Sequence, residues 1–147
     1  MNALKKTYRP GTAVTFAAAA LVSLAAYSSV AFGDEVKVTL SGAQEVPAVK
    51  TSASGGGTIM INADKSVSGS VTTTGIAGTA AHIHLAAAGK NGPVIVPLTK
   101  SGDATWSVPA GAKLTDDQFK AYKAGDLYVN VHSAANKGGE IRGQLKP

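Results

Sequence analysis

Apolar and polar residues alternate along much of the chain after residue 33, in short stretches separated by turn-forming residues. A period of two residues is typical of a β-strand that buries one of its faces. Many short strands with regular turn signals predict an all-β fold, here an immunoglobulin-like or Greek-key β-sandwich. The strands are expected at residues 36–40, 58–61, 67–73, 80–85, 94–98, 104–108, 127–133 and 140–145.

One segment near the C-terminal end has the signals of a helix instead. Thr115 and Gln118 have the spacing of a capping box, and Leu114 and Phe119 that of the hydrophobic staple that accompanies it. Gly125 is a typical residue just past the C-terminus of a helix. We therefore expect one short helix, which connects two strands and has a structural role.

The first 33 residues have the three parts of an export signal, and we expect them to be removed as a signal peptide. The parts are the basic residues Lys5, Lys6 and Arg9, an apolar run over 13–26, and the small-residue site Ala31, Phe32 and Gly33. The apolar run is short for a membrane span. Cleavage is expected before Asp34, with a cut after Ala31 as the alternative. The mature domain, residues 34–147, would then be periplasmic or extracellular, with no membrane attachment.

The composition excludes several classes of function. The chain has 14 Lys and Arg against 9 Asp and Glu, but three of these basic residues lie in the predicted signal. With only 5% aromatic residues and no basic run in the mature part, nucleic acid is not an expected partner. Cysteine is absent. Disulfides, iron–sulfur clusters, blue-copper centres and cysteine-bound zinc are therefore excluded.

All three histidines of the chain lie on predicted strands. His82 and His84 are two residues apart, so both point to one face of their strand, roughly 7 Å apart. Two such imidazoles can bind one metal ion with bonds of about 2 Å, and His132 on a neighbouring strand would complete the site. Imidazole ligands without thiolate suit copper, with zinc as the alternative.

Alternation also assigns a face to each histidine. The aliphatic residues of these strands share one face, so the histidines are expected on the polar exterior of the sheet. A fourth ligand or a neighbouring group could be water or one of several candidates, and the pattern does not choose among them. The candidates are Glu140, Tyr128, Asn130, Arg142 and Met60.

Other residues favour structural roles. Trp106 is expected in the core, and Arg142 is expected in a surface ion pair with an acid such as Glu140. Gly55–Gly57 precedes a predicted strand rather than a helix, so we interpret it as a bend or bulge and not as a phosphate loop. Protease, P-loop and serine-hydrolase motifs are absent from the sequence, and no catalytic residue is predicted.

Three groups of motifs resemble the CHRD domain family, named for chordin, over about residues 36 to 145. They are LSGAQEVPAV at 40–49, AHIH at 81–84 with GKNGPV at 89–94, and YVNVH at 128–132 with GGEIRGQ at 138–144. The chain departs from the family pattern at Ala48, Leu85 and Lys137, and none of these is a histidine. The resemblance implies an immunoglobulin-like β-sandwich that is usually secreted, and it implies little about biochemistry.

The histidine pattern is also similar to the copper side of copper–zinc superoxide dismutases. Those enzymes have a further metal-bridging histidine, a zinc loop and a disulfide, and this sequence has no counterpart of any of them. The similarity therefore extends to copper ligands and not to a complete dismutase. Whether the protein is an enzyme stays open, with a non-enzymatic role favoured.

Three hypotheses follow. In the first, an exported β-sandwich binds one copper ion through His82, His84 and His132 for storage, delivery or redox chemistry. In the second, the domain is a metal-free extracellular module with a protein or glycan partner, and its shared residues are structural. In the third, the exposed histidines bind a metal shared with a second copy, which gives a homodimer.

Overall fold

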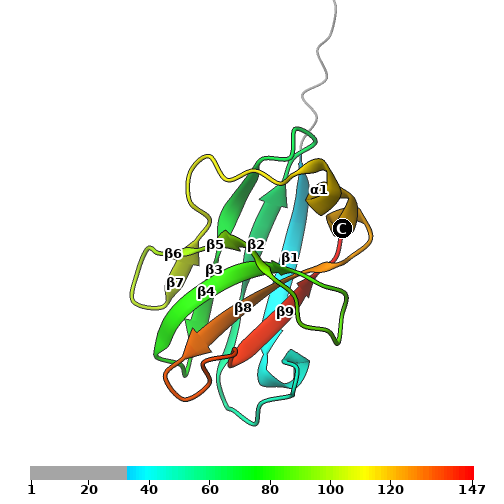
Figure 1. The fold of residues 1–147 in the computed structure, drawn as a ribbon. Coiled ribbons are helices and arrows are strands. Elements are labelled where there is room, and N and C mark those ends of the chain that lie inside the picture. Colours follow the sequence, from blue (N-terminus) through cyan, green and yellow to red (C-terminus); the bar gives the residue numbers. More distant parts are fainter. Residues whose placement is uncertain (1–32) are drawn as a thin grey trace, which may run out of the picture.

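The computed structural model describes residues 33–147, and in that range most of the regular secondary structure is β-strand (Figure 1). The predicted signal peptide, except for its last residue, lies outside the described residues. One short α-helix interrupts the strands of this range, as its capping signals predicted. The elements are β1 Asp34–Ser41, a 3-10 turn η1 Gly42–Gln44, β2 Ser54–Ile61, β3 Val67–Thr74, β4 Gly78–Leu85, β5 Val94–Pro97, β6 Thr99–Lys100, β7 Thr105–Ser107, α1 Asp116–Lys123, β8 Leu127–Ser133 and β9 Ile141–Leu145.

All of these strands belong to one antiparallel sheet of nine strands, in the order β5-β4-β8-β9-β1-β2-β3-β7-β6. β1 and β9 pair at a single position, Ser41 with Arg142. The two ends of the sheet come together at Leu98, which donates its backbone N–H to the carbonyl of Ala81 in β4, 2.9 Å away. The sheet is therefore nearly closed, and the two layers of the predicted sandwich are parts of one folded sheet.

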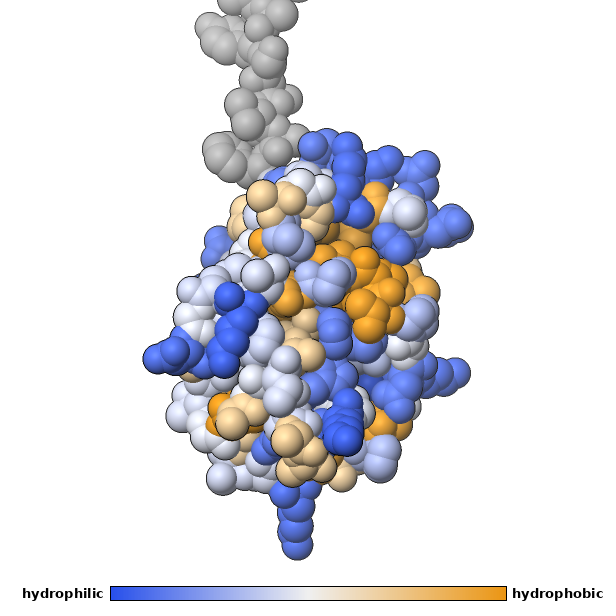
Figure 2. Space-filling view, turned by 60° about the vertical axis from the view of Figure 1, so that its left-hand side comes forward, coloured by the Kyte–Doolittle hydropathy of each residue, from blue (hydrophilic) through white to orange (hydrophobic). Residues whose placement is uncertain are grey.

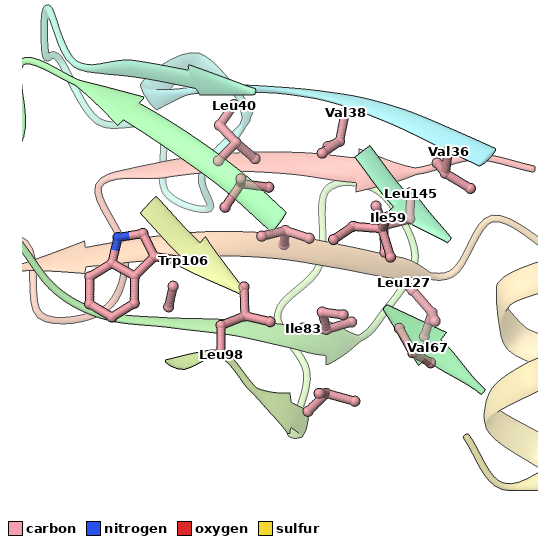
Figure 3. Packing of buried hydrophobic residues seen from close by; sticks show 14 of the residues in the cluster. Val36, Val38, Leu40, Ile59, Val67, Ile83, Leu98, Trp106, Leu127 and Leu145 are labelled. Carbon is pink, nitrogen blue, oxygen red and sulfur yellow. The ribbon is translucent and has the colours of Figure 1, made fainter. Parts of the chain in front are cut away.

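The core lies between these layers and consists of the aliphatic residues of each alternating strand (Figure 3). Leu40, Ile59, Leu127 and Leu145 are fully buried, and Trp106 is 4% exposed, which confirms its predicted place in the core. Burying one such aliphatic side chain stabilises the fold by about 1.5–3 kcal/mol. The hydrophobic faces of many short strands thus supply the stability without any disulfide.

Gly55–Gly57 does not form the predicted bend or bulge. The three residues lie inside β2, which pairs residue by residue with both β1 and β3 and has no register shift. A Cβ at Gly57 would stand 2.1 Å from the carbonyl oxygen of Ser70 on β3. These glycines therefore allow a close approach of neighbouring strands, which the sequence pattern could not distinguish from a bend.

The helix is confirmed with its predicted signals. Thr115 caps it by accepting a hydrogen bond from the backbone of Gln118, and the Gln118 side chain accepts one from the Thr115 backbone, which completes the capping box. The chain leaves the helix at Gly125, where φ is +80°. The side chains of Tyr122 and Lys123 both donate to the Asp34 carboxylate, and so fasten the helix to the start of β1.

The surface of the described domain is mostly polar. Figure 2 shows one face with one larger hydrophobic patch and several smaller ones among hydrophilic side chains. Among the described residues, Val94 is the exposed large hydrophobic side chain, with 47% of its surface accessible. The same part of the chain contains no helix with the length and apolar character that crossing a membrane requires.

Candidate metal centre

The three histidines lie on neighbouring strands, because β8 pairs with β4 in the sheet. The register sets His132 opposite Ala80. It sets Asn130 opposite His82. Directly opposite residues of an antiparallel pair lie on the same face of the sheet, so the strand order brings the histidine of β8 beside the pair on β4.

The imidazoles of His82, His84 and His132 form one compact cluster. Each offers a nitrogen, and the three nitrogens lie within 4.8 Å of one another. Nδ1 of His82 is 2.9 Å from Nε2 of His132. Two nitrogens bound at right angles to one metal, each about 2 Å from it, would be about 2.8 Å apart. The spacing therefore suits two ligands of one ion as well as a hydrogen bond.

Backbone carbonyls fix the orientation of two of the rings. The carbonyl oxygen of Gly92 lies 2.9 Å from Nδ1 of His84, and that of Lys137 lies 2.8 Å from Nδ1 of His132. A carbonyl only accepts hydrogen bonds, so each Nδ1 is protonated and each Nε2 keeps its lone pair. The Nε2 of His84 is buried and has no hydrogen-bond partner.

The environment keeps two of these imidazoles neutral. Burial lowers the pKa of His82, and the neighbouring rings of His132 and His84 lower it further. Burial also lowers the pKa of His84, although the hydrogen bond to Gly92 and the nearby Asn130 side chain, which favour the protonated ring, oppose this effect. Neutral imidazole is the form that binds metals, so the lowered pKa values of His82 and His84 favour the form of each ring that can act as a ligand.

The polar face that carries the cluster was predicted to be exposed to solvent, but several of its side chains are buried. Asn130 and Arg142 are each 1% exposed, Tyr128 is 2% exposed and His84 is 8% exposed. Two segments fold back over this face, residues 42–53 after β1 and residues 86–93 after β4. Alternation shows which residues share a face, and it does not show that a loop covers that face.

Arg142 is buried in this layer, so the predicted surface ion pair with Glu140 is wrong. The Arg142 guanidinium carbon lies 3.4 Å from the centre of the Tyr128 ring. The Tyr128 ring is in turn stacked on His84, with 4.7 Å between ring centres and 1° between planes. Arg142 also donates to the carbonyl oxygen of Lys90 at 2.6 Å. It thereby holds the loop whose Gly92 carbonyl orients His84.

The comparison with known families identifies the domain. The family model of the CHRD domain matches residues 36–145. The chain belongs to the CHRD domain family. No curated protein and no solved structure matches it.

The motifs by which the chain resembles the CHRD family meet in the covered polar layer. The first motif supplies Glu45, the central one supplies Asn91, and the last pair supplies Asn130 and Arg142. Asn91 links the two covering loops, because its amide donates to the carbonyl of Val46 while its oxygen accepts from Arg142. The motifs of this CHRD domain thus build one interconnected layer beside the histidines.

Two of the predicted neighbours of the cluster lie elsewhere in the CHRD domain. The Glu140 carboxylate accepts a hydrogen bond from the hydroxyl of Thr51 at 2.7 Å. Hydrogen bonds from Ser133, Thr51 and Asn136 hold the pKa of Glu140 below its usual value.

Met60 lies on β2, opposite Glu35. Glu35 is at the end of β1 away from Ser41, the residue that meets β9. At about 3.3 Å per residue, six residues separate these positions by about 20 Å. The strand register therefore keeps Met60 away from the histidines.

Tyr128 and Asn130 do border the cluster. The Tyr128 hydroxyl accepts a long hydrogen bond, 3.4 Å, from the backbone N–H of Gly92, and its ring supports His84 by stacking. The side chain of Asn130 is fully enclosed, and its Oδ1 has no hydrogen-bond partner. Of the predicted neighbours, Asn130 thus offers a buried, unpaired oxygen at the site.

Glu45, like Asn91, is a member of this layer that the sequence pattern did not predict. It is 6% exposed, and one carboxylate oxygen, Oε1, has no partner. Burial raises the pKa of Glu45, while the charge of Arg142 and a hydrogen bond from Asn130 oppose the rise. A glutamate inside the first family motif was the one available signal, and its burial depends on how the segment folds over β9.

Proposed function

We propose that this CHRD domain is exported and binds one copper ion through His82, His84 and His132. The observation that carries the proposal is the convergence of three imidazole nitrogens within 4.8 Å. Two of these rings are oriented by backbone carbonyls, the arrangement commonly found around metal-ligating histidines.

The chemistry of the donor set supports copper ahead of zinc. Three neutral nitrogen donors bind both metals, and at a site without thiolate the affinity order of divalent ions favours copper(II). The cluster is partly covered rather than enclosed, since His82 and His132 are half-buried. Storage, delivery or redox chemistry at an open coordination position fits such a site.

Export is part of the proposal and rests on the N-terminal pattern of basic residues, apolar run and small-residue site. The absence of cysteine is compatible with an oxidising compartment, because no thiol is present to be oxidised. N-terminal sequencing of the protein recovered from the periplasm or the medium tests this part. An N-terminus at residue 34 or 32 supports it, and an intact Met1 contradicts it.

The first experiment is a competition titration of the purified protein with copper(II) and with copper(I). We expect one-to-one binding that is weakened in His132→Ala by more than the 10- to 100-fold that loss of an outer-sphere partner costs. Electron paramagnetic resonance of the copper(II) form should show a type 2 signal with nitrogen coupling. Equal affinity in His132→Ala and wild type would rule out the assignment.

Thr79→Ala is a matched control for that variant. Thr79 is exposed and donates its hydroxyl to the backbone carbonyl of His132, at 3.3 Å. The substitution changes a side chain next to the cluster and leaves every imidazole in place. It should bind copper like the wild type.

The second candidate is a metal-free binding module, and the hydrogen bond between His82 and His132 favours it. In that case the histidines hold β4 to β8 without any ion. This function predicts the same unfolding midpoint with chelator and with copper, whereas the copper site predicts a higher midpoint with copper. A metal-bridged dimer predicts instead that the molecular mass in solution falls when a chelator is added.

A further inference from the structure

Asn130 is the residue next to the histidine cluster whose bonding is incomplete. It lies opposite His82 across the β4–β8 pair, and only 1% of it is exposed. An amide has two donors and an acceptor to satisfy, and a buried polar atom without a partner is uncommon in folded proteins. The bonding of Asn130 is therefore informative about what the site holds.

The amide nitrogen of Asn130 is directed toward Gly138 and Glu45. Nδ2 donates to the carbonyl oxygen of Gly138 at 3.4 Å. The Glu45 carboxylate lies on the same side, since a Cβ built at Gly139 would be 2.5 Å from Nδ2 of Asn130 and 2.4 Å from Oε1 of Glu45. Both groups are acceptors, so the nitrogen of the amide belongs on this side and the oxygen on the side of His84.

Two acceptor atoms of neighbouring side chains are consequently left without a proton, since Asn130 is close enough to His84 to affect its pKa. Nε2 of His84 has no partner, and neither has Oδ1 of Asn130. Nδ1 of His84 already carries the ring proton that Gly92 accepts, so neutral His84 has none to offer to Asn130. A cation satisfies both atoms at once, because nitrogen and oxygen lone pairs are both metal donors.

Resting on the proposed copper site, we propose that Oδ1 of Asn130 is the fourth ligand, which gives the centre three nitrogens and one oxygen. An amide oxygen is a hard donor, and it binds copper(II) far better than the soft copper(I) ion. The three imidazoles bind both oxidation states. Asn130 therefore makes the centre selective for the oxidised metal and lowers its reduction potential.

The test compares copper(II) and copper(I) affinities in wild type and Asn130→Leu, which keeps the approximate shape and removes the oxygen. We expect copper(II) affinity to fall by about tenfold or more, since the loss of an outer-sphere partner alone costs that much. The copper(I) affinity should be unchanged. The matched control is Gln144→Leu. Gln144 is a half-buried amide on the same face of β9, and it donates to the carbonyls of Ala86 and Gly125 instead.

Asn130→Asp keeps the proposal testable if the leucine variant does not fold. It restores an oxygen with added charge, and should bind copper(II) at least as tightly as wild type, with a more negative reduction potential. Equal losses for both oxidation states, or no loss in Asn130→Leu, would overturn the fourth ligand and leave the three-histidine site standing. Wild-type protein that binds neither oxidation state would overturn the proposed function itself.

Discussion

The two faces of β4 and β8 are both covered, the outer one in part, but their chemistry is opposite. On the inner face, Ile83 and Val129 pack into an apolar core in which each is 1% exposed or less. On the outer face, Asn130 is equally enclosed and lies among polar groups. The inner face is covered by the other half of the sheet, and the outer face by two loops held with hydrogen bonds.

This difference has an energetic consequence. Apolar burial is non-directional and grows with the area removed from water, so the inner face tolerates changes that keep volume. A buried polar layer is stable only when its donors and acceptors are paired. The unpaired atoms of His84, Asn130 and Glu45 all lie in the outer layer. That layer is therefore the place where a ligand would increase stability most.

The largest expected effect is a loss of stability from a core substitution on β4, and it tests whether the two faces of this strand are independent. Ile83→Ala should lower the free energy of unfolding by about 2–5 kcal/mol, because it leaves a cavity in the core. The loss should be the same with chelator and with copper, since Ile83 faces away from the cluster. Urea denaturation measures it, and the exposed Thr79→Ala should stay within about 0.5 kcal/mol of wild type. A copper-dependent loss in Ile83→Ala would mean that the two faces are coupled.

The next effect belongs to the outer face alone. Free copper at 100 times its dissociation constant should raise the free energy of unfolding by about 2.7 kcal/mol, because it binds the folded state. The same gain is expected in Ile83→Ala, and His132→Ala should lose most of it. Thermal unfolding with and without copper measures the gain. An equal gain in His132→Ala would show that copper stabilises the protein through other groups.

The contrast also explains how far the sequence could predict this molecule. Period-two alternation identified the inner face most clearly in β1 and β8, because every second residue of these strands is a buried aliphatic residue. The same pattern gave the shared face of His82, His84 and His132, but not the adjacency of β4 and β8, which depends on long-range pairing. The burial of Arg142 was not predictable, since it depends on loop carbonyls such as that of Lys90.

Glu45→Gln should reveal the cost of a charge in the outer layer. Burial raises the pKa of Glu45 in the folded state. The folded protein therefore binds the Glu45 carboxyl proton more tightly than the unfolded chain does. The stability that this proton contributes is complete below the unfolded pKa and is lost as the pH rises through the folded pKa. Over that pH range, the free energy of unfolding of Glu45→Gln should rise relative to that of wild type by about 1.4 kcal/mol for each unit of pKa difference.

Urea denaturation of the metal-free protein between pH 4 and pH 7 measures this gain. Glu35→Gln on the exposed face of β1 is the control, and should show little change. A variant that becomes less stable relative to wild type as pH rises would mean that the charge of Arg142 outweighs the burial of the carboxylate. Glu45 and Arg142 would then form a stabilising ion pair in the outer layer, and the buried carboxylate would not destabilise the protein.

The smallest effect concerns a feature that belongs to neither face. Thr115→Ala removes the hydroxyl that accepts from the Gln118 backbone at 3.2 Å, and should cost about 1 kcal/mol. Thr115→Ser keeps that acceptor and is the matched control. Neither variant should alter copper affinity, because the capping hydrogen bonds join only Thr115 and Gln118. The Tyr122–Asp34 hydrogen bond joins the helix to β1. A change in copper affinity in Thr115→Ala would show that the stability of the helix affects the positions of the histidines on β4 and β8.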